Sequence, residues 1–395
     1  MKDKIKSFLY DIYCSHIYHC SDSMLSRVFV ENCKKNHINP FLKVEGEEKY
    51  IEFWRKAFGK RKVDVYSYRL FSHYMGCVPY IIPEVIGYTL LEKHLNPLRY
   101  RDFYSDKNAY SMYFPIPGVM PKTLMCRVCG GAILTYNEEK KQSKMVFPKE
   151  MIATLSSETI SQVMEGYDKI CVKPAVDTCS GVGVNLFQRK GKKFVSGDGV
   201  CLDGIYLKNL GDDWVVQEVI AQHPYMSQFN ESSINTLRIC VYRSVLDEQP
   251  KVTGALMRVG ANGAFVDNAH AGGRFVGVDV KTGKLHHTTL DQYGTKENVW
   301  NGVDYSKADY QIPHWEEIKK LAVRIADCNI HCRLLAFDLC LDSAGNPRVI
   351  ELNVGMFSWW LFLFIAQDVF AGKTQAVIDY CLEKEKQFHP HLRLM

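Results

Sequence analysis

The segment from Leu334 to Asn353 constrains the fold of this chain most, because it predicts a β-hairpin with carboxylates on one face. Two apolar strands, LLAFDLCL and PRVIELN, flank the turn sequence DSAGN. A turn centred between Ala344 and Gly345 places residue 338 opposite residue 351 in antiparallel pairing. Because side chains alternate along a strand, Asp338, Glu351 and Asn353 are expected to share one face. The other face is expected to carry Leu335, Phe337, Leu339, Leu341, Ile350 and Leu352.

Two carboxylates and an amide on one face predict a cation site. Directly opposed residues have Cβ atoms about 5 Å apart, and carboxylates at that separation repel each other unless a cation or protons lie between them. Oxygen ligands of this kind suit Mg²⁺. On this interpretation, removing one carboxylate leaves the metal-free protein as stable as before, or more stable. A solvated outer face of the hairpin is the alternative, and the pattern leaves both open.

Lys173 is the second informative residue, because it interrupts the apolar strand ICVKPAV. The loop that follows contains Ser180, Gly181 and Gly183. A buried lysine needs an anion, and a glycine loop lets backbone amides approach phosphate oxygens. The P-loop pattern and the three-glycine dinucleotide fingerprint are both absent from this segment. A structural lysine beside a surface loop therefore remains the alternative.

Composition excludes several classes of protein. Of 395 residues, 47% are hydrophobic and 24% are charged, which argues against a disordered chain, a collagen or a coiled coil. The net charge of +5 is spread along the chain and does not indicate nucleic-acid binding, although it suits an anionic substrate. The longest apolar stretch, residues 354–366, is too short to span a bilayer. We therefore expect a soluble protein without a signal peptide, in the cytoplasm.

Fourteen cysteines are expected to be reduced thiols rather than a disulfide framework, since several lie inside apolar runs (Cys171, Cys240, Cys332 and Cys340). Two cysteine patterns leave alternatives open. Cys14, His16, His19 and Cys20 satisfy a zinc shell poorly, and the pair Cys126 and Cys129 has no second pair downstream. The basic, amphipathic first residues suit docking onto the domain better than contact with an anionic membrane surface.

The order of elements predicts an α+β fold with antiparallel sheets. Residues 1–99 read as a helical region. From residue 100, short strands alternate with helices, including a hairpin that turns at Gly130 and Gly131, a helix over 149–165 and a helix that begins near His314. We place boundaries so that residues 100–215 form one subdomain and residues 216–395 another.

Six motifs in this order resemble the sugar-transfer-associated branch of the ATP-grasp superfamily, which is related to α-L-glutamate ligase-like proteins. They are SDKNAYSMYF with PKTL, the VKP of Lys173 with its glycine loop, QEVI, SSINTLRI with GALMRVG, VDNAHAGG, and D338 with IELN. The resemblance covers about residues 100–370. It implies an ATP-grasp fold after the helical region, in which two α+β subdomains with antiparallel sheets grip ATP, residues 100–215 being the nucleotide-binding lid and 216–395 the catalytic subdomain.

The resemblance also implies roles for individual residues. Arg238 and Arg258 resemble the arginines that steady the γ-phosphate and an acyl-phosphate, and the position of the ribose contact falls near Gln222 or His223. Phosphate and adenine contacts would come from Lys107, Lys173, Ser180, Gly181, Gly183, Gln217, Glu218 and Ile220. Asp338, Glu351 and Asn353 match the magnesium ligands. Asn268, Gly272, Gly273 and Arg274 resemble a loop over the acceptor site.

The resemblance implies an ATP- and Mg²⁺-dependent carboxylate–amine ligase that works through an acyl-phosphate, in polysaccharide or sugar-conjugate biosynthesis. Its partners would be a small-molecule or sugar-linked carboxylate and an amine. Two alternatives stay open: an ATP-grasp kinase acting on a small molecule, and a non-catalytic ATP-binding regulatory module.

Overall fold

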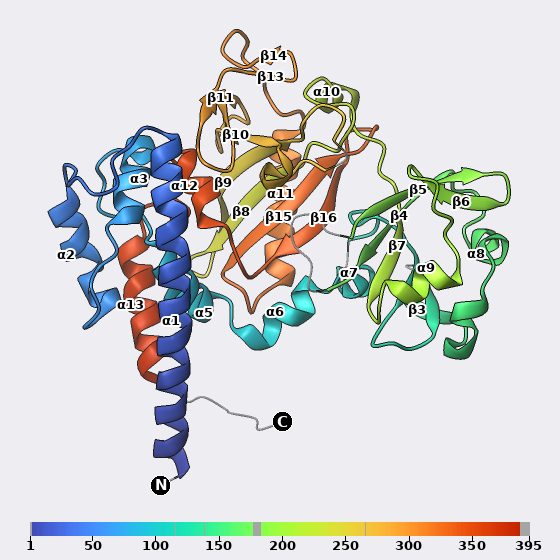
Figure 1. Cartoon of the computed structure of the whole chain (residues 1–395), viewed down its shortest axis with the longest axis horizontal. Coiled ribbons are helices and arrows are strands. Elements are labelled where there is room, and N and C mark those ends of the chain that lie inside the picture. Colours follow the sequence, from blue (N-terminus) through green and yellow to red (C-terminus); the bar gives the residue numbers. More distant parts are fainter. Residues whose placement is uncertain (1, 115, 138, 177–182, 265, 388–395) are drawn as a thin grey trace.

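Two seven-stranded antiparallel sheets organise the chain in this computed structural model, which describes residues 2–114, 116–137, 139–176, 183–264 and 266–387. Helices of the N-terminal region lie on one side of the second sheet, and the first sheet forms a separate lobe on the other side (Figure 1). The prediction of a helical region before the sheets is confirmed. Its helices and the two that follow are α1 (Lys2–Lys35), α2 (Glu47–Phe58), α3 (Tyr66–Met75), α4 (Glu84–Ile86), η1 (Gly87–Leu91), α5 (Glu92–Leu95), α6 (Leu98–Ser105) and α7 (Lys107–Tyr113).

The first sheet has the strand order β3-β2-β1-β7-β4-β5-β6. Its strands are β1 (Thr123–Arg127), β2 (Ile133–Asn137), β3 (Gln142–Phe147), β4 (Lys169–Pro174), β5 (Asn185–Lys190), β6 (Lys193–Ser196) and β7 (Trp214–Glu218), with η2 (Lys149–Thr154), α8 (Ser157–Val163) and α9 (Gly204–Asn209). Strands β1 and β2 form the hairpin predicted around Gly130 and Gly131. Strand β7 straddles the boundary that we drew at residue 215, and it pairs only within this first sheet, with β1 and β4.

The second sheet has the order β12-β11-β10-β9-β8-β15-β16. Its strands are β8 (Leu237–Arg243), β9 (Pro250–Val259), β10 (Arg274–Val278), β11 (Leu285–Leu290), β12 (Lys296–Glu297), β15 (Leu334–Leu341) and β16 (Pro347–Asn353). Around them lie α10 (Pro224–Ser227), η3 (Ala269–Ala271), the pair β13 (Val299–Trp300) and β14 (Val303–Asp304), α11 (Trp315–Cys328), α12 (Trp359–Phe364) and α13 (Thr374–Gln387).

The register of the β15–β16 hairpin is the one that the turn predicts, with Asp338 opposite Glu351. One part of the prediction is wrong. A bulge after Asp338 pairs Leu339 with Val349, so Ile350 is skipped. Val349, rather than Ile350, joins the apolar residues of β15 in the core beneath the sheet.

The helix predicted over 149–165 is also wrong in part, because two helices occupy that segment. The 3₁₀-helix η2 ends at Thr154, and α8 begins after Ser156. The Ser156 hydroxyl accepts a hydrogen bond from the Thr159 backbone N–H at 3.2 Å. This side-chain cap satisfies an amide that would otherwise have no partner, so the chain restarts there as a new helix.

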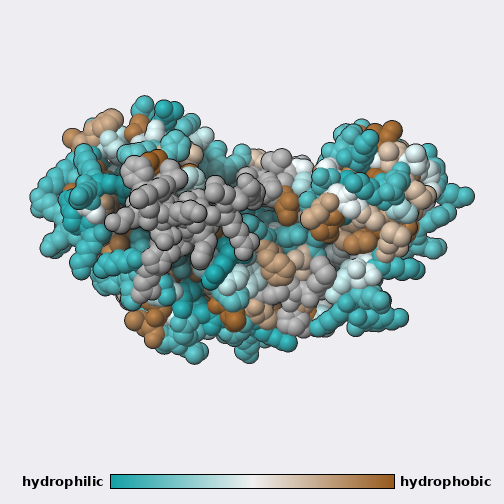
Figure 2. Space-filling view, turned by 90° about the horizontal axis from the view of Figure 1, so that it is seen from below, coloured by the Kyte–Doolittle hydropathy of each residue, from teal (hydrophilic) through white to brown (hydrophobic). Residues whose placement is uncertain are grey.

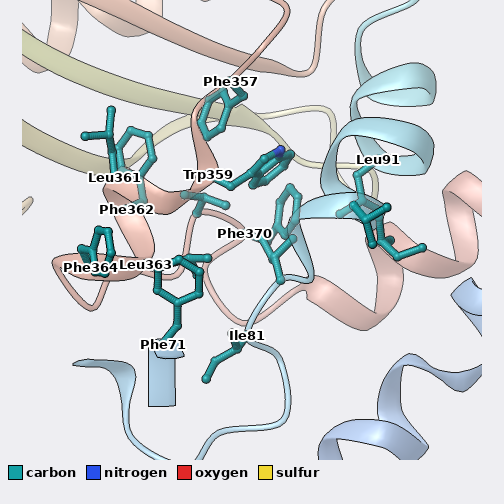
Figure 3. Packing of buried hydrophobic residues seen from close by; sticks show 14 of the residues in the cluster. Phe71, Ile81, Leu91, Phe357, Trp359, Leu361, Phe362, Leu363, Phe364 and Phe370 are labelled. Carbon is teal, nitrogen blue, oxygen red and sulfur yellow. The ribbon is translucent and has the colours of Figure 1, made fainter. Parts of the chain in front are cut away.

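The N-terminal helices and the end of the chain share one core, which covers part of the second sheet. Aromatic residues of the segment from Phe357 to Phe370 converge there on Phe71, Ile81 and Leu91 (Figure 3). The sheet contributes Leu334 and Ala336, which alternate with Asp338 on the same face. The N-terminal region therefore buries one half of this face and stops short of the half that carries the carboxylates. None of the described helices has both the length and the apolar character needed to cross a bilayer.

Glu84 is buried between the N-terminal helices and the segment around Trp360, and it predicts a pH effect on stability. Burial raises the pKa of Glu84 to about 8, although the carboxylate accepts a hydrogen bond from the Trp360 N–H at 3.1 Å. The folded protein therefore holds this proton to higher pH than the unfolded chain does, so stability falls as pH rises from about 4.5 to about 8. At ~1.4 kcal/mol per pKa unit, the change amounts to a few kcal/mol.

The variant Glu84→Gln cannot ionise, and we expect its melting temperature to fall less than that of the wild type between about pH 5 and pH 8. Replacing the exposed Glu52 with glutamine is the matched control, and it should leave the wild-type slope unchanged. Identical slopes in Glu84→Gln and the wild type would show that Glu84 does not titrate in this interval.

Candidate active site

The carboxylate of Asp338 lies at the centre of a buried ion-pair cluster on the second sheet. It is 2% exposed and accepts two hydrogen bonds of 2.8 Å from Arg238 Nε and Nη2. Arg238 stands directly opposite it on β8, so the short distance follows from the strand register. Arg258 Nη2, from β9, lies 3.5 Å from the same carboxylate. The sheet thus brings Asp338 together with Arg238 and Arg258, two of the three arginines that the sequence predicted.

These arginines overturn the expectation of two mutually repelling carboxylates. Burial alone would raise the pKa of Asp338, but Arg238 and then Arg258 outweigh it and hold the pKa at about 2. Asp338 is therefore ionised because the protein supplies its own cations. We therefore expect its removal to destabilise the metal-free protein, the reverse of the expectation from the sequence, because the buried Arg238 guanidinium would lose its anion and Arg258 would keep only Asp267.

Glu351 contacts Lys107 of α7, a helix that packs against β1 and β7 and so belongs to the lobe of the first sheet, called the first lobe below. Lys107 Nζ lies 2.9 Å from Glu351 Oε1, and Lys107 is 6% exposed. The motif around Lys107 explains its position. Asp106 caps helix α7 by accepting from the Asn108 N–H at 2.8 Å, and Asn108 Nδ2 donates to the Arg127 carbonyl of β1 at 3.0 Å. These two side chains fix the start of α7, from which Lys107 reaches Glu351 on β16.

Lys173 is a buried cation for which no described residue supplies a hydrogen bond or an ion pair. It lies on β4 and is 6% exposed. Burial lowers its pKa, the nearby charge of Lys107 lowers it further, and Cys171 and Glu351 act in the opposite direction. A cation in this position is stabilised by any anion that enters the site. We therefore expect an anion to bind beside Lys173.

In the described part of the loop after Lys173, position 183 requires glycine. Gly183 has φ of +76°, and a Cβ there would come within 2.9 Å of the Pro174 side chain. Any other residue would therefore push the loop away from the end of β4. The predicted phosphate-loop residues Ser180 and Gly181 lie outside the described residues.

The donor set of the hairpin fits a magnesium ion. Asn353 donates through Nδ2 to Asp338 Oδ2 at 3.5 Å, which leaves its carbonyl oxygen available as a ligand. Each oxygen of Asp338 can bind a metal ion while it accepts a hydrogen bond from Arg238, because a carboxylate has about four lone-pair sites. Glu351 adds a partly exposed carboxylate on the same face. Two carboxylates and one amide carbonyl are ligands that Mg²⁺ prefers when phosphate oxygens and water complete its shell.

Asp267 belongs to this cluster although the sequence analysis did not select it. Its carboxylate pairs with Arg258 Nη2 at 3.0 Å and accepts hydrogen bonds from both the backbone and the hydroxyl of Thr236. Asp267 is 7% exposed and precedes Asn268 in the motif VDNAHAGG. Its position beside Asn268 in this motif was the signal that the sequence offered. Its function here is to hold Arg258 in place.

The predicted adenine hinge lies at the end of β7. Gln217 is buried, and its Nε2 donates to the Pro121 carbonyl at 3.4 Å. Glu218 is engaged with the second sheet, because its Oε1 accepts from Arg348 of β16 at 2.5 Å. Ile220 is 8% exposed. The Glu218–Arg348 pair links the two lobes beside the hinge.

Both residues near the expected ribose position use side-chain atoms in local hydrogen bonds. Gln222 donates to the carbonyls of Asn230 and Ser233 and accepts from the Asn235 N–H, so its amide organises the following loop. His223 Nδ1 accepts from the Tyr225 N–H at the start of α10.

Arg274 lies apart from the other predicted arginines. It stands opposite Val259, whereas Arg258 stands opposite Phe275, so the two arginines project from opposite faces of the sheet. Arg274 donates to Thr289 Oγ1 at 2.9 Å and pairs with Glu297 at 3.3 Å. Its neighbour in the sequence motif, Asn268, caps the short helix η3 through the His270 N–H. The structure thus gives both side chains local structural contacts.

The cysteine and histidine patterns of the sequence do not form metal clusters. No group of three His, Cys, Asp or Glu side chains in the described part of the chain is arranged to hold a metal. This includes Cys14, His16, His19 and Cys20. Cys126 is buried, Cys129 is exposed, and both are free thiols.

A family model described as sugar-transfer associated ATP-grasp matches residues 103–377. None of the curated proteins matches the chain.

Several solved structures are similar to the chain at low identity. They include the ATP-grasp ligase PsnB complexed with minimal precursor (13% identity, TM-score 0.36, 72% of this chain and 63% of that one) and D-alanyl-alanine synthetase A from Vibrio cholerae (12%, 0.36, 71% and 66%). N5-carboxyaminoimidazole synthase from Aspergillus clavatus is another (10%, 0.37, 72% and 54%). The chain spans less than two thirds of the length of the first of these.

Proposed function

Since the chain belongs to the sugar-transfer associated ATP-grasp family, we propose that it is a carboxylate–amine ligase that forms an amide through an acyl-phosphate. ATP and Mg²⁺ are the cofactors of this family and therefore of this chain. The description of the family supports a sugar-linked or small-molecule acid as the substrate, within polysaccharide or sugar-conjugate biosynthesis.

One observation carries this proposal, namely the charges that meet between the two lobes. Lys107 and Lys173 come from the first lobe, whereas Arg238 and Arg258 come from the second sheet beside Asp338 and Glu351. Seen from below, the outline of the molecule dips between the lobe at the right and the rest (Figure 2). A triphosphate between the lobes would meet lysines on one side and the ligands of its metal ion on the other.

In the proposed reaction, the substrate carboxylate attacks the γ-phosphorus of ATP and ADP leaves. A bound Mg²⁺ supplies charge neutralisation on the phosphate oxygens. Lys107 and Lys173 orient the phosphates as fixed positive charges. Arg258, held by Asp267 and Thr236, is placed to balance the negative charge of the acyl-phosphate. The amine then attacks the carbonyl carbon, the C–O bond to phosphate breaks, and phosphate and a proton leave.

Trapping with hydroxylamine tests this chemistry. Pools of uronic and other acids, incubated with the protein, ATP, Mg²⁺ and hydroxylamine, should yield a hydroxamate and equal amounts of ADP by mass spectrometry. Omitting Mg²⁺ or the acid should abolish both products. AMP with pyrophosphate would contradict the acyl-phosphate, and a stable phosphate ester with ADP would identify a kinase instead.

A further inference from the structure

A single buried asparagine outside the family match closes the open end of the β15–β16 hairpin. Asn96 lies between α5 and α6 and is 1% exposed. Its Oδ1 accepts from the backbone N–H groups of Arg333 and Leu334, each at 3.0 Å. Its Nδ2 donates to the carbonyl of Leu334 and, at 2.8 Å, to that of Val354. One side chain thus joins the first residue of β15 to the residue that follows Asn353.

The same stretch of the N-terminal region fixes the segment after the hairpin. The Glu92 carboxylate accepts from the backbone N–H groups of Met356 and Phe357, each at 3.0 Å, and from Trp359 Nε1 at 2.9 Å. Met356 and Ser358 have φ of +51° and +61°, values that side chains other than glycine rarely adopt. Strained backbone of this kind persists only where surrounding contacts hold it in place.

We propose that Asn96 is a positioning residue for the magnesium ligands of the hairpin, acting through the backbone of β15 and β16. This inference rests on the proposed function, because it assumes that Asp338, Glu351 and Asn353 bind the metal. The turn at Asp342–Gly345 closes one end of the hairpin, and Asn96 closes the other. Without Asn96, the two strands lose the contact that joins them one residue beyond Asn353.

Fraying of β15 and β16 at this end would change the separation between Asn353 and Asp338. Asn353 belongs to the last pair of the β15–β16 ladder, where it stands opposite Ala336. Metal ligands must be held within about 0.5 Å of their productive geometry. The expected consequence is weaker metal binding, with the lysines of the first lobe unaffected. The N-terminal region then belongs to the catalytic unit although the family match begins only at residue 103.

The test is Mn²⁺ binding, measured by electron paramagnetic resonance in the presence of ADP, for the wild type and Asn96→Ala. Partners of metal ligands typically contribute 10–100-fold to metal affinity, and for this more indirect contact we expect a loss of about 3–10-fold. Affinity for ADP without metal should stay within about twofold. Asn329→Ala is the matched control, because Asn329 is fully buried and its Nδ2 donates to the Ile325 carbonyl at the end of α11, a bond that does not join β15 to β16.

Equal Mn²⁺ affinity in Asn96→Ala and the wild type, with a melting temperature lowered as in Asn329→Ala, would overturn the proposal and leave Asn96 a structural role only. If Asn96→Ala does not fold, Asn96→Ser keeps one hydrogen-bonding group and should show the same weakening. Failure of the wild type itself to bind Mn²⁺ with ADP would instead refute the metal site, and this inference with it.

Discussion

Replacing Asp338 with asparagine is expected to abolish Mg²⁺-dependent turnover and to lower the free energy of unfolding by about 3–5 kcal/mol. The stability loss follows from Arg238, which would keep its buried charge without an anion, and from Arg258, which would keep only Asp267 as its partner. Glu351→Gln should abolish turnover as well but cost only about 1 kcal/mol, because Glu351 is partly exposed and glutamine still accepts a hydrogen bond from Lys107. Since both act through one metal, the double variant should be little slower than either single one.

Urea denaturation and ADP formation with the acid found by trapping measure the two effects. Glu47→Gln is the matched control, because Glu47 forms a similarly buried two-point pair with Arg69 in the N-terminal region. It should lose stability and keep turnover. Normal turnover in Asp338→Asn or Glu351→Gln would remove these residues from the metal site.

The stabilising effect of Asp338 should also disappear in acid. Its pKa is lowered to about 2 in the folded protein, so its contribution is present above about pH 4 and is lost as pH falls through about 2.

Replacing Lys173 with methionine should weaken ATP binding about 10–100-fold while raising the melting temperature of the nucleotide-free protein. A hydrogen bond to a charged group contributes ~1.5–3 kcal/mol, which accounts for the loss of affinity. Methionine fills the same space without a charge, so the variant avoids burial of a cation beside Lys107. Thermal unfolding with and without saturating ATP and Mg²⁺ measures both effects, since bound ligand raises the melting temperature.

Lys169→Met changes an exposed lysine on the same strand and should alter neither quantity. An ATP-induced shift in Lys173→Met as large as that of the wild type would exclude Lys173 from the nucleotide site. A large loss of stability without nucleotide would mean that Lys173 has a structural partner.

Much of the fold could be predicted because the determining signals are local. Alternation of apolar residues and a centred turn were sufficient to pair Asp338 with Glu351. The ATP-grasp fold is confirmed by the family match over residues 103–377 and by the two antiparallel sheets. The order of motifs predicted this fold because each motif belongs to one strand or loop.

Other features depend on contacts between distant parts of the chain. The bulge that skips Ile350 is invisible in a pattern of alternating residues, since isoleucine suits either face. Arg274 and Arg258 look equivalent in the sequence, yet their registers place them on opposite faces of the sheet. Asn96 carries no signal at all, because a lone asparagine between two helices is usually a cap or a turn.

The sequence by itself therefore determined that the candidate ligands Asp338, Glu351 and Asn353 share one face of the hairpin. Only the tertiary structure decided what those residues face: Arg238 and Arg258 around Asp338, Lys107 against Glu351, and Asn96 across the hairpin end. The physical reason is range. Strand alternation and turn geometry act over a few residues, whereas ion pairs and buried hydrogen bonds join groups that only the folded chain brings within about 3 Å.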